Sequence, residues 1–301
     1  MQAQLKKSYI QLHLAIILAG FTGVFGKLVI LNETLLVFWR VLFASLMLVG
    51  LLKFLRKKKG PITLSKKVGF MLANGALLAL HWVFFFGSIK ASTVSLGVLC
   101  FCLTSFFTAL LEPLMNKKRF SLKELALSSL SLLGISFIFG FDSAYRWGIF
   151  LGVISSILVS FFTIFNERLV KQHDTFTVTT FQMVGGTLGL SVIIMGRMLW
   201  GSFSFSMPQG MDVWYLLILS LVCTVCMYIL INNALRHINS FTVNLSFNLE
   251  PVYGIFLSFL IFNEAEDFSG SFWIGVSIIV LSLVLQTVFA KPIRKRAKKV
   301  G

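Results

Sequence analysis

Two ionisable side chains stand near the middle of long apolar stretches in this chain. His81 lies in the run LALHWVFF and Glu250 in the run SFNLEPVY. If these stretches cross a membrane, each ionisable group costs about 2.5–3.5 kcal/mol on insertion scales, so it normally faces an interior cavity or a partner. An imidazole exchanges protons near neutral pH, and a carboxylate binds either a proton or an amine. His81 and Glu250 are therefore candidates for contact with a solute or a coupling proton.

Three other charged side chains lie nearer the ends of their apolar stretches. They are Lys27, Arg40 and Glu112. At such depths a long charged side chain reaches towards the membrane surface or pairs near it. We therefore expect either this interfacial placement or, for Arg40 and Glu112, a role in coupling or gating.

The elements that must position these residues follow from the composition. Of the 301 residues, 57% are apolar and 13% are charged, with a mean hydropathy of +0.88. Soluble domains carry roughly 45–50% apolar and about 25% charged residues, so a soluble globular protein is excluded, and so is a disordered chain. About 20 apolar residues span a bilayer as a helix. We predict an all-α polytopic membrane protein with ten transmembrane helices, at 10–31, 35–55, 67–89, 92–115, 122–141, 147–169, 176–197, 213–235, 239–262 and 270–290.

The distribution of basic residues predicts the orientation. The net charge of +16 would favour nucleic-acid binding in a soluble chain, but here the basic residues lie between apolar stretches, where they set topology. With a cytoplasmic N-terminus, 22 of the 27 Lys and Arg residues fall on the inner side, and only Lys90, Arg146 and Arg197 fall on the outer side. Both termini are therefore predicted to be cytoplasmic, the number of spans is even, and nucleic acid is not expected as a partner.

The chain also repeats itself. A shift of 146 residues lays residues 87–105 over 233–251, with Phe101 on Phe247 and the pair His81-Trp82 on Met227-Tyr228. The predicted repeats are 10–141 and 147–290, followed by a basic cytoplasmic tail at 291–301. Because each repeat holds five helices, an odd number, the second enters the membrane upside down. Inverted repeats around a site at the midplane are typical of secondary transporters.

The repeat also helps to choose the face of the 239–262 helix that lines a cavity. At 100° per residue, Asn244 and Asn248 lie on one stripe and Phe247 and Glu250 on another. The second stripe maps onto a polar and aromatic face of the 92–115 helix, so we favour it. The asparagines then flank the cavity or bond to neighbouring helices.

Two sets of candidate residues result. The predicted substrate-binding residues are His81, Trp82, Phe101, Thr104, Phe247 and Glu250. The possible coupling or gating residues are Arg40, Glu112, Asn74, Asn244 and Asn248, of which Asn74 shares a helix face with His81. An aromatic surface with a few polar groups suits a small amphiphilic solute. The alternative is hydrogen bonding between helices in a static bundle.

Other chemistry is not expected. The CxxC spacing at Cys223 and Cys226 is found in zinc and redox sites, but no second CxxC or His pair accompanies it. No phosphate-binding loop, HExxH motif or nucleophile elbow occurs. We therefore predict no metal, no cofactor and no enzymatic activity.

Two segments resemble the EamA family of the drug/metabolite transporter superfamily. They are LALHWVFFFGSIKASTVSLGVLCFCLTSFFTALLEP (Leu78–Pro113) and NALRHINSFTVNLSFNLEPVYGIFLSFLIFNE (Asn233–Glu264), and the likeness extends to Arg40. The resemblance implies a ten-helix, exporter-like permease with a central cavity, in a family that moves amino acids, nucleobases, metabolites or drugs, often outward. The chain departs from the pattern at Ser105, where the repeat often has Pro, and at Lys118, which replaces the usual Glu.

The expected function is outward secondary transport of a small amphiphilic metabolite, an amino acid or a related compound, by alternating access. The expected location is the bacterial inner membrane. Expected partners are the small-molecule substrate, membrane lipid and protons, with the protein acting as a monomer or homodimer. An importer of the same solutes, a non-transporting scaffold or receptor, and a membrane enzyme are the alternatives.

Overall fold

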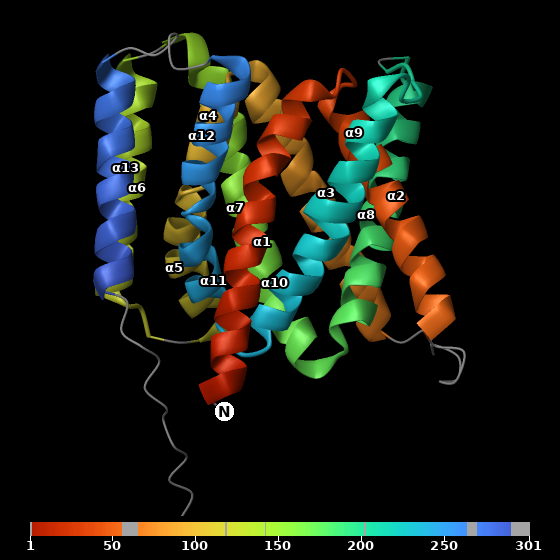
Figure 1. The fold of residues 1–301 in the computed structure, drawn as a ribbon, viewed down its shortest axis with the longest axis horizontal. Coiled ribbons are helices and arrows are strands. Elements are labelled where there is room, and N and C mark those ends of the chain that lie inside the picture. The colour runs from red at the N-terminus through yellow and green to blue at the C-terminus, as the bar shows by residue number, and fades with distance from the viewer. Residues whose placement is uncertain are drawn as a thin grey trace, which may run out of the picture.

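The computed structural model describes residues 2–55, 66–117, 119–141, 143–201, 203–263 and 270–289, and these form helices joined by short connections (Figure 1). The first half holds α1 (Gln2–Leu28), α2 (Glu33–Leu55), α3 (Lys66–Ala91), α4 (Val94–Cys100), α5 (Leu103–Asn116) and α6 (Leu122–Phe141). The second half holds α7 (Arg146–Gln172), α8 (Thr175–Leu199), α9 (Met211–Ser220), α10 (Met227–Leu235), α11 (Ser240–Phe247), α12 (Glu250–Phe262) and α13 (Gly270–Phe289). The all-α class predicted from the sequence is confirmed.

Several residues that the sequence analysis singled out lie outside the described residues. They are Lys118, Glu264, the basic loop around Lys58 and the tail at 291–301.

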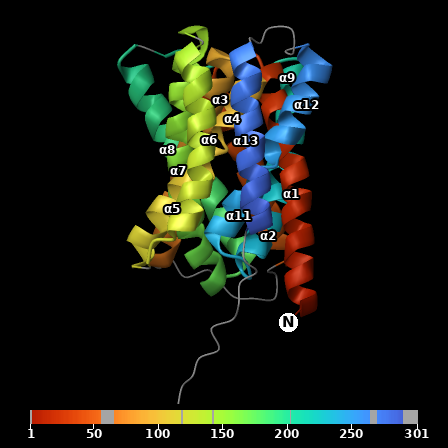
Figure 2. The same cartoon turned by 90° about the vertical axis from the view of Figure 1, so that its left-hand side faces the viewer.

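Eight helical stretches within the described residues are long and apolar enough to cross a membrane. They are α1, α2, α3, α4 with α5, α7, α8, α9 with α10, and α11 with α12. The remaining helices, α6 and α13, pack side by side at one edge of the bundle (Figures 1 and 2). Helices of this length satisfy their own backbone hydrogen bonds in a bilayer, so this is the fold of an integral membrane protein.

Three helices that were predicted as continuous are interrupted, which corrects the sequence-based prediction. The 92–115 helix divides into α4 and α5, the 239–262 helix into α11 and α12, and the 213–235 helix into α9, a π-helical turn η2 (Leu221–Cys226) and α10. The α11–α12 break precedes Pro251, which has no N–H for the carbonyl four residues earlier. Ser105 takes the equivalent place in the α4–α5 break, where its hydroxyl donates to the Cys102 carbonyl at 3.0 Å.

The two broken helices repeat the same details at a spacing of 146 residues. Thr93 caps the N-terminus of α4 and Asn239 caps that of α11, each through its side-chain oxygen. Lys117 and Asn263 end α5 and α12 in the left-handed conformation, with φ of 50° and 54°. In Figure 1, α4 and α12 lie in the upper half and α5 and α11 in the lower half, so the related helices run in opposite directions. A two-repeat architecture of inverted orientation follows.

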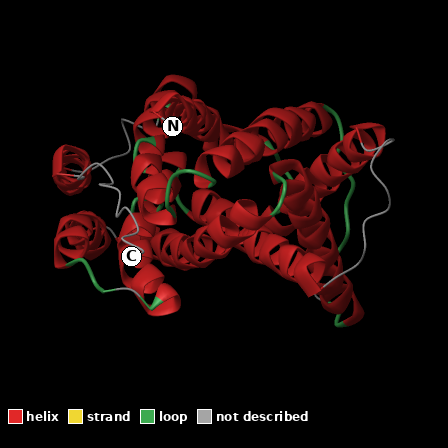
Figure 3. Ribbon diagram, turned by 90° about the horizontal axis from the view of Figure 1, so that it is seen from below, coloured by secondary structure: helices red, strands yellow, loops and turns green. Residues whose placement is uncertain are grey.

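The packing of the other helices encloses the middle of the bundle. Helix α3 packs along α7 and α8, and α1 packs along α10 and α12. Gly75 and Gly185 allow the close approach of α3 and α8, because a methyl group on Gly75 would overlap the backbone of Gln182, and one on Gly185 the backbone of Leu72. Viewed along the helices, the α6–α13 pair stands apart at the left edge (Figure 3). The central helices, rather than this pair, therefore form the site.

Candidate functional site

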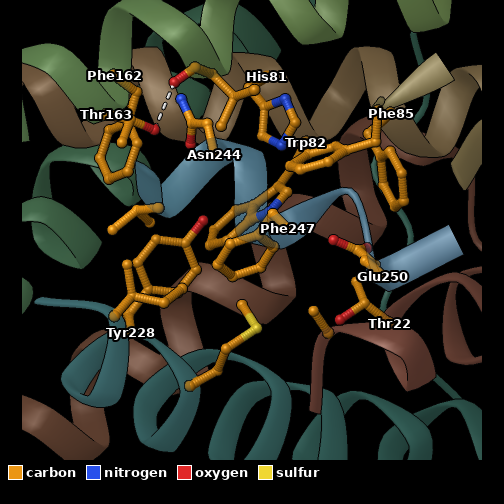
Figure 4. A pocket seen from close by; sticks show the side chains of 16 residues that line it. Thr22, His81, Trp82, Phe85, Phe162, Thr163, Tyr228, Asn244, Phe247 and Glu250 are labelled. Carbon is orange, nitrogen blue, oxygen red and sulfur yellow. Dashed lines mark hydrogen bonds between the residues drawn. The ribbon is translucent and has the colours of Figure 1, made fainter. Parts of the chain in front are cut away.

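A cavity lies between α1, α3, α7, α10 and the two broken helices, near the middle of the spans (Figure 4). The space between protein atoms in this region, open solvent included, is about 530 Å³. The lining side chains are those of Ala19, Thr22, His81, Trp82, Phe85, Phe101, Val159, Phe162, Thr163, Met227, Tyr228, Ile231, Val243, Asn244, Phe247 and Glu250. Both halves of the chain therefore contribute to its wall.

Four pairs of these residues are related by the 146-residue repeat. The pairs are His81 with Met227, Trp82 with Tyr228, Phe85 with Ile231, and Phe101 with Phe247. The cavity consequently lies at the interface between the two inverted halves, where a site shared by two conformations is expected.

Glu250 is the acidic residue among the side chains that line the cavity. It is the first residue of α12, is 4% exposed, and points into the cavity beside Thr22 (Figure 4). Within the described residues, no hydrogen bond or ion pair holds its carboxylate. A carboxylate buried in this way is costly unless a proton or a cation joins it. The Glu250 end of the cavity is thus suited to bind either.

His81 is fixed by hydrogen bonds on one side of its ring. Its Nδ1 lies 2.9 Å from the Ser155 carbonyl oxygen and 2.8 Å from the Ser155 hydroxyl. Because a carbonyl only accepts, Nδ1 carries a proton, and Nε2 of the neutral ring is left as an acceptor. The ring also contacts Phe85 and Phe101, with centroids 6.1 and 5.7 Å apart. His81 is therefore a positioned hydrogen-bond acceptor in the cavity wall.

Aromatic rings form the rest of the wall. Trp82 and Tyr228 meet edge to face with centroids 5.4 Å apart, and Phe162 meets Tyr228 at 5.9 Å. Phe101 and Phe247, which come from the two helix breaks, lie 6.2 Å apart. Ring faces attract cations and apolar groups alike, so this wall suits an ammonium group attached to an apolar body.

Arg40 lies inside the bundle, so of the two alternatives given for it the interfacial one does not apply, and a role in coupling or gating stays a prediction. Its side chain is completely buried behind Trp82, with the guanidinium carbon 3.9 Å from the ring centroid. Its Nε donates to the Thr224 hydroxyl at 2.6 Å, and an Nη donates to the Cys223 carbonyl at 2.8 Å. Both acceptors belong to η2, and such π-helical turns occur often at functional sites. Arg40 supports the cavity wall with a positive charge but does not line it.

The opposite end of the cavity carries neutral polar groups. Asn244 and Thr163 lie together there, away from Glu250 (Figure 4). Asn244 donates through Nδ2 to the Thr108 hydroxyl at 2.8 Å, so its Oδ1 is left to accept. Asn248 stands outside the cavity and donates to the Ser105 hydroxyl at 3.1 Å. The two asparagines thus tie α11 to α5, as expected for side chains that flank a cavity.

Carboxylates close the predicted inner end. The Ser240 hydroxyl at the start of α11 donates to Glu112 of α5 at 3.0 Å. The Ser240 backbone N–H donates to Glu167 of α7 at 2.8 Å, and Glu167 also pairs with Lys171. Both carboxylates lie at the N-terminus of α11, where a negative charge is stabilised. We call Glu112, Glu167 and Ser240 the inner latch.

Hydroxyl groups make the corresponding contact at the predicted outer end. Ser95 of α4 and Ser258 of α12 are joined by a hydrogen bond of 2.8 Å. Ser258 is the repeat counterpart of Glu112. We call Ser95 and Ser258 the outer latch. Each latch joins the two broken helices beyond one end of the cavity.

The cavity is narrow. The space open to the centres of water molecules is about 40 Å³, which holds about three waters at roughly 10–15 Å³ each. A solute the size of an amino acid requires the helices around it to move apart.

The structure brings together most of the residues chosen from the sequence. Of the six predicted substrate-binding residues, five line the cavity. Thr104 lies outside the lining; it is fully buried, and its hydroxyl has no partner in the described residues. Of the five coupling or gating candidates, Asn244 lines the cavity, and Glu112 belongs to the inner latch. Asn74, Arg40 and Asn248 lie outside the lining.

Sequence reasoning missed several lining residues. Met227 and Tyr228 had a usable signal, because the repeat pairs them with His81 and Trp82. The others missed are Ala19, Thr22, Phe85, Val159, Phe162, Thr163, Ile231 and Val243. Small polar and apolar residues of these types occur on every face of α1 and α7, so no pattern marked those that face the cavity.

Comparison with known proteins places the chain among transporters. The model of the EamA-like transporter family matches residues 6–140 and 146–288, one match to each half. The uncharacterized transporter YdfC of Bacillus subtilis (strain 168) is 27% identical over 205 residues, which cover 65% of this chain and 61% of that protein. The chain thus matches somewhat less than two thirds of the length of this relative.

A solved structure supports the fold. A crystal structure of another protein, 14% identical in sequence, superposes with a TM-score of 0.67 and covers 96% of this chain and 99% of its own. At this identity the likeness shows a shared fold and no more.

Proposed function

Because this chain belongs to the EamA-like transporter family, we propose that it is a secondary transporter that moves a small amphiphilic metabolite outward across the membrane. The solute carries an ammonium group beside an apolar body, as amino acids and related compounds do. The observation that carries the proposal is the cavity, in which an unpaired carboxylate faces aromatic rings between two inverted halves of the chain.

The chemistry of the wall supports this class of solute. An ammonium group would bind the Glu250 carboxylate and the faces of the nearby rings, which is favourable in a dry site. The apolar body would fill the space between Trp82, Phe101 and Phe247. Asn244 Oδ1 and His81 Nε2 are both acceptors, so they would bind further N–H or O–H groups of the solute.

Alternating access is the mechanism we propose. In an inverted repeat, exchanging the conformations of the two halves converts an inward-open protein into an outward-open one. The inner and outer latches would open in turn, with α6 and α13 completing a set of ten transmembrane helices. A proton on Glu250, exchange, or the gradient of the solute itself would supply the driving force, and the protein would act as a monomer or homodimer surrounded by lipid.

The 22 to 3 distribution of basic residues supports cytoplasmic termini in a bacterial inner membrane. We propose the outward direction because members of the family often transport outward. An experiment on whole cells tests this direction separately from transport itself.

The test is a flux screen in liposomes that contain the purified protein. Amino acids, their decarboxylated amines, nucleobases and cationic drugs would be loaded and their release measured. We expect amines and amino acids with apolar side chains to be released faster than from empty liposomes. Cells that overproduce the protein should then accumulate the same compound outside. Internal accumulation would reverse the proposed direction, and the absence of flux for every class would favour a receptor or scaffold.

A variant of the carboxylate tests the site. Glu250→Gln keeps the shape of the side chain and removes its charge, so we expect flux to fall to the background rate with normal amounts of folded protein. Asp174→Asn is the matched control, because it removes a carboxylate at the cap of α8, away from the cavity, and Asn also caps helices. Normal flux by Glu250→Gln would remove Glu250 from the site.

A further inference from the structure

A chain of buried amide side chains lies just beyond the cavity. Asn166 Nδ2 donates to Asn232 Oδ1 at 2.6 Å, and Gln182 Nε2 donates to Asn166 Oδ1 at 2.9 Å. Asn232 Nδ2 donates in turn to the Thr179 hydroxyl at 2.8 Å. All four side chains are fully buried, and they join α7, α8 and α10.

Helical spacing places these amide side chains where the cavity wall continues towards the predicted cytoplasmic side. Asn166 follows Phe162 by four residues on α7, and Asn232 follows Tyr228 by four residues on α10. Residues four apart share a helix face, so both asparagines lie one turn further along the faces that line the cavity. Both helices run towards the predicted cytoplasmic side.

Asn74 occupies the corresponding place on α3. It precedes His81 by seven residues and so lies on the same face, two turns nearer the predicted cytoplasmic side. Its neighbour Gly75 is in contact with the backbone of Gln182, which brings α3 against the amide chain. We call Asn74, Asn166, Gln182 and Asn232 the amide cluster.

The amide cluster has unused hydrogen-bonding capacity. Asn74 is 2% exposed, yet neither its Nδ2 nor its Oδ1 has a partner in the described residues, and Gln182 Oε1 is also unpartnered. A buried amide left without partners is expensive, and lipid offers none. These three atoms, one N–H donor nitrogen and two acceptor oxygens, carry no charge, which fits a polar head group that arrives and leaves.

We propose that the amide cluster is a second solute subsite, which the head group of the solute occupies on the inner route to the cavity. The carboxylate of an amino acid would accept from Asn74 Nδ2, and the two unpartnered oxygens would accept from its ammonium group. The Glu250 end of the cavity binds the ammonium group at a later point of the same route. The proposal rests on the proposed function and adds a subsite to it.

Two matched probes separate the subsite from the cavity. L-Phenylalanine and phenethylamine share the aromatic body and the ammonium group, and only the first has a carboxylate. Asn74→Leu should raise the half-saturating concentration of L-phenylalanine about tenfold or more, the loss expected for a hydrogen bond to a charged group, and leave that of phenethylamine within about threefold. Ser88→Ala is the control, because Ser88 is buried on the same face of α3 near the other end, and its hydroxyl is also unpartnered. Equal losses for both probes, or none, would overturn the proposal.

A labelling experiment gives a second measurement that needs no transported probe. A cysteine at Asn74, in a variant without the four native cysteines, should react with a small thiosulfonate applied from the cytoplasmic side, whereas a cysteine at Ser88 should not. If the protein transports L-phenylalanine, this amino acid should slow the reaction of the cysteine at Asn74. If neither probe is transported but the cysteine reacts, the proposed solute is wrong and the inner route stands. If the cysteine at Asn74 does not react, the subsite is refuted.

Discussion

Replacing Glu112 by serine would give the inner latch a hydroxyl in place of a carboxylate, as the outer latch has at Ser258. Glu112 and Ser258 are repeat counterparts, and each contacts the opposing broken helix near its end: Glu112 accepts from Ser240 at 3.0 Å, and Ser258 bonds to Ser95 at 2.8 Å. The hydrogen bond between Ser95 and Ser258 therefore shows how two neutral side chains make this contact. We expect Glu112→Ser to favour opening of the predicted cytoplasmic side.

The magnitude follows from the two kinds of hydrogen bond. A bond to a charged group contributes about 1.5–3 kcal/mol, whereas neutral bonds between transmembrane helices average about 0.6 kcal/mol. The difference is about 1–2 kcal/mol. Since about 1.4 kcal/mol is a tenfold change in an equilibrium constant, the inward-open population should rise roughly 5–30-fold where it is a minor state.

A cysteine in the cavity reports this population. Thr163→Cys is a suitable reporter because Thr163 lines the cavity and its hydroxyl bonds only to the Val159 carbonyl of its own helix, at 2.8 Å. In inside-out vesicles, its rate of reaction with a membrane-impermeant thiosulfonate should rise with Glu112→Ser by the factor above. Ser131→Ala is the matched control, since it breaks a buried hydroxyl pair between α6 and α13, with Ser282 at 3.0 Å, away from both latches.

Two results would refute this reasoning. If the labelling rate of Thr163→Cys is unchanged, Glu112 does not hold the inner side closed. If the labelling rate falls, Glu112 holds the inner side open. The reciprocal variant Ser258→Glu should instead slow labelling of the reporter from the outside, because it places a charge-assisted bond in the outer latch.

Much of the cavity could be predicted because the repeat is visible in the sequence. The shift of 146 residues pairs Trp82 with Tyr228 and Phe101 with Phe247, and all four line the cavity. A pseudo-twofold interface uses equivalent positions from both halves, so a single alignment identifies both sides. Glu250 was found in another way, through the cost of placing a carboxylate near mid-span.

The position of Arg40 could not be predicted, because its partners arise from a backbone irregularity. The π-helical turn η2 presents the Cys223 carbonyl and the Thr224 hydroxyl to the guanidinium. A regular helix would use that carbonyl internally. No residue in LVCTVC marks the turn, so an interfacial position was the natural expectation for a basic residue near the end of a span.

The helix breaks were also hidden, for different reasons in the two halves. Pro251 could have indicated the break in the second half, but a proline in the middle of an apolar stretch also fits a continuous kinked helix. In the first half, Ser105 replaces the proline, and only its hydroxyl bond to Cys102 compensates for the changed backbone. The broken geometry is therefore shared by the two halves although its local cause is not.

Three further predictions concern orientation, the site and packing. A cysteine replacing Lys58 should react with impermeant reagent only from the cytoplasmic side, and one replacing Asp212 only from outside; the reverse pattern would invert the topology. His81→Ala should abolish or strongly reduce flux without loss of folded protein, because it removes a fixed acceptor from the cavity wall, and unchanged flux would exclude that role. Gly75→Ala should lower the stability of the protein in detergent, measured by thermal inactivation, because its methyl group would overlap a backbone carbonyl of α8 that cannot rotate away. Overpacking of this kind costs about 1–3 kcal/mol and outweighs the gain of about 1 kcal/mol in helix propensity. Gly50→Ala, with open space around it, receives only that gain and should be at least as stable as the wild type; if both variants are equally stable, α3 and α8 are not in contact as described.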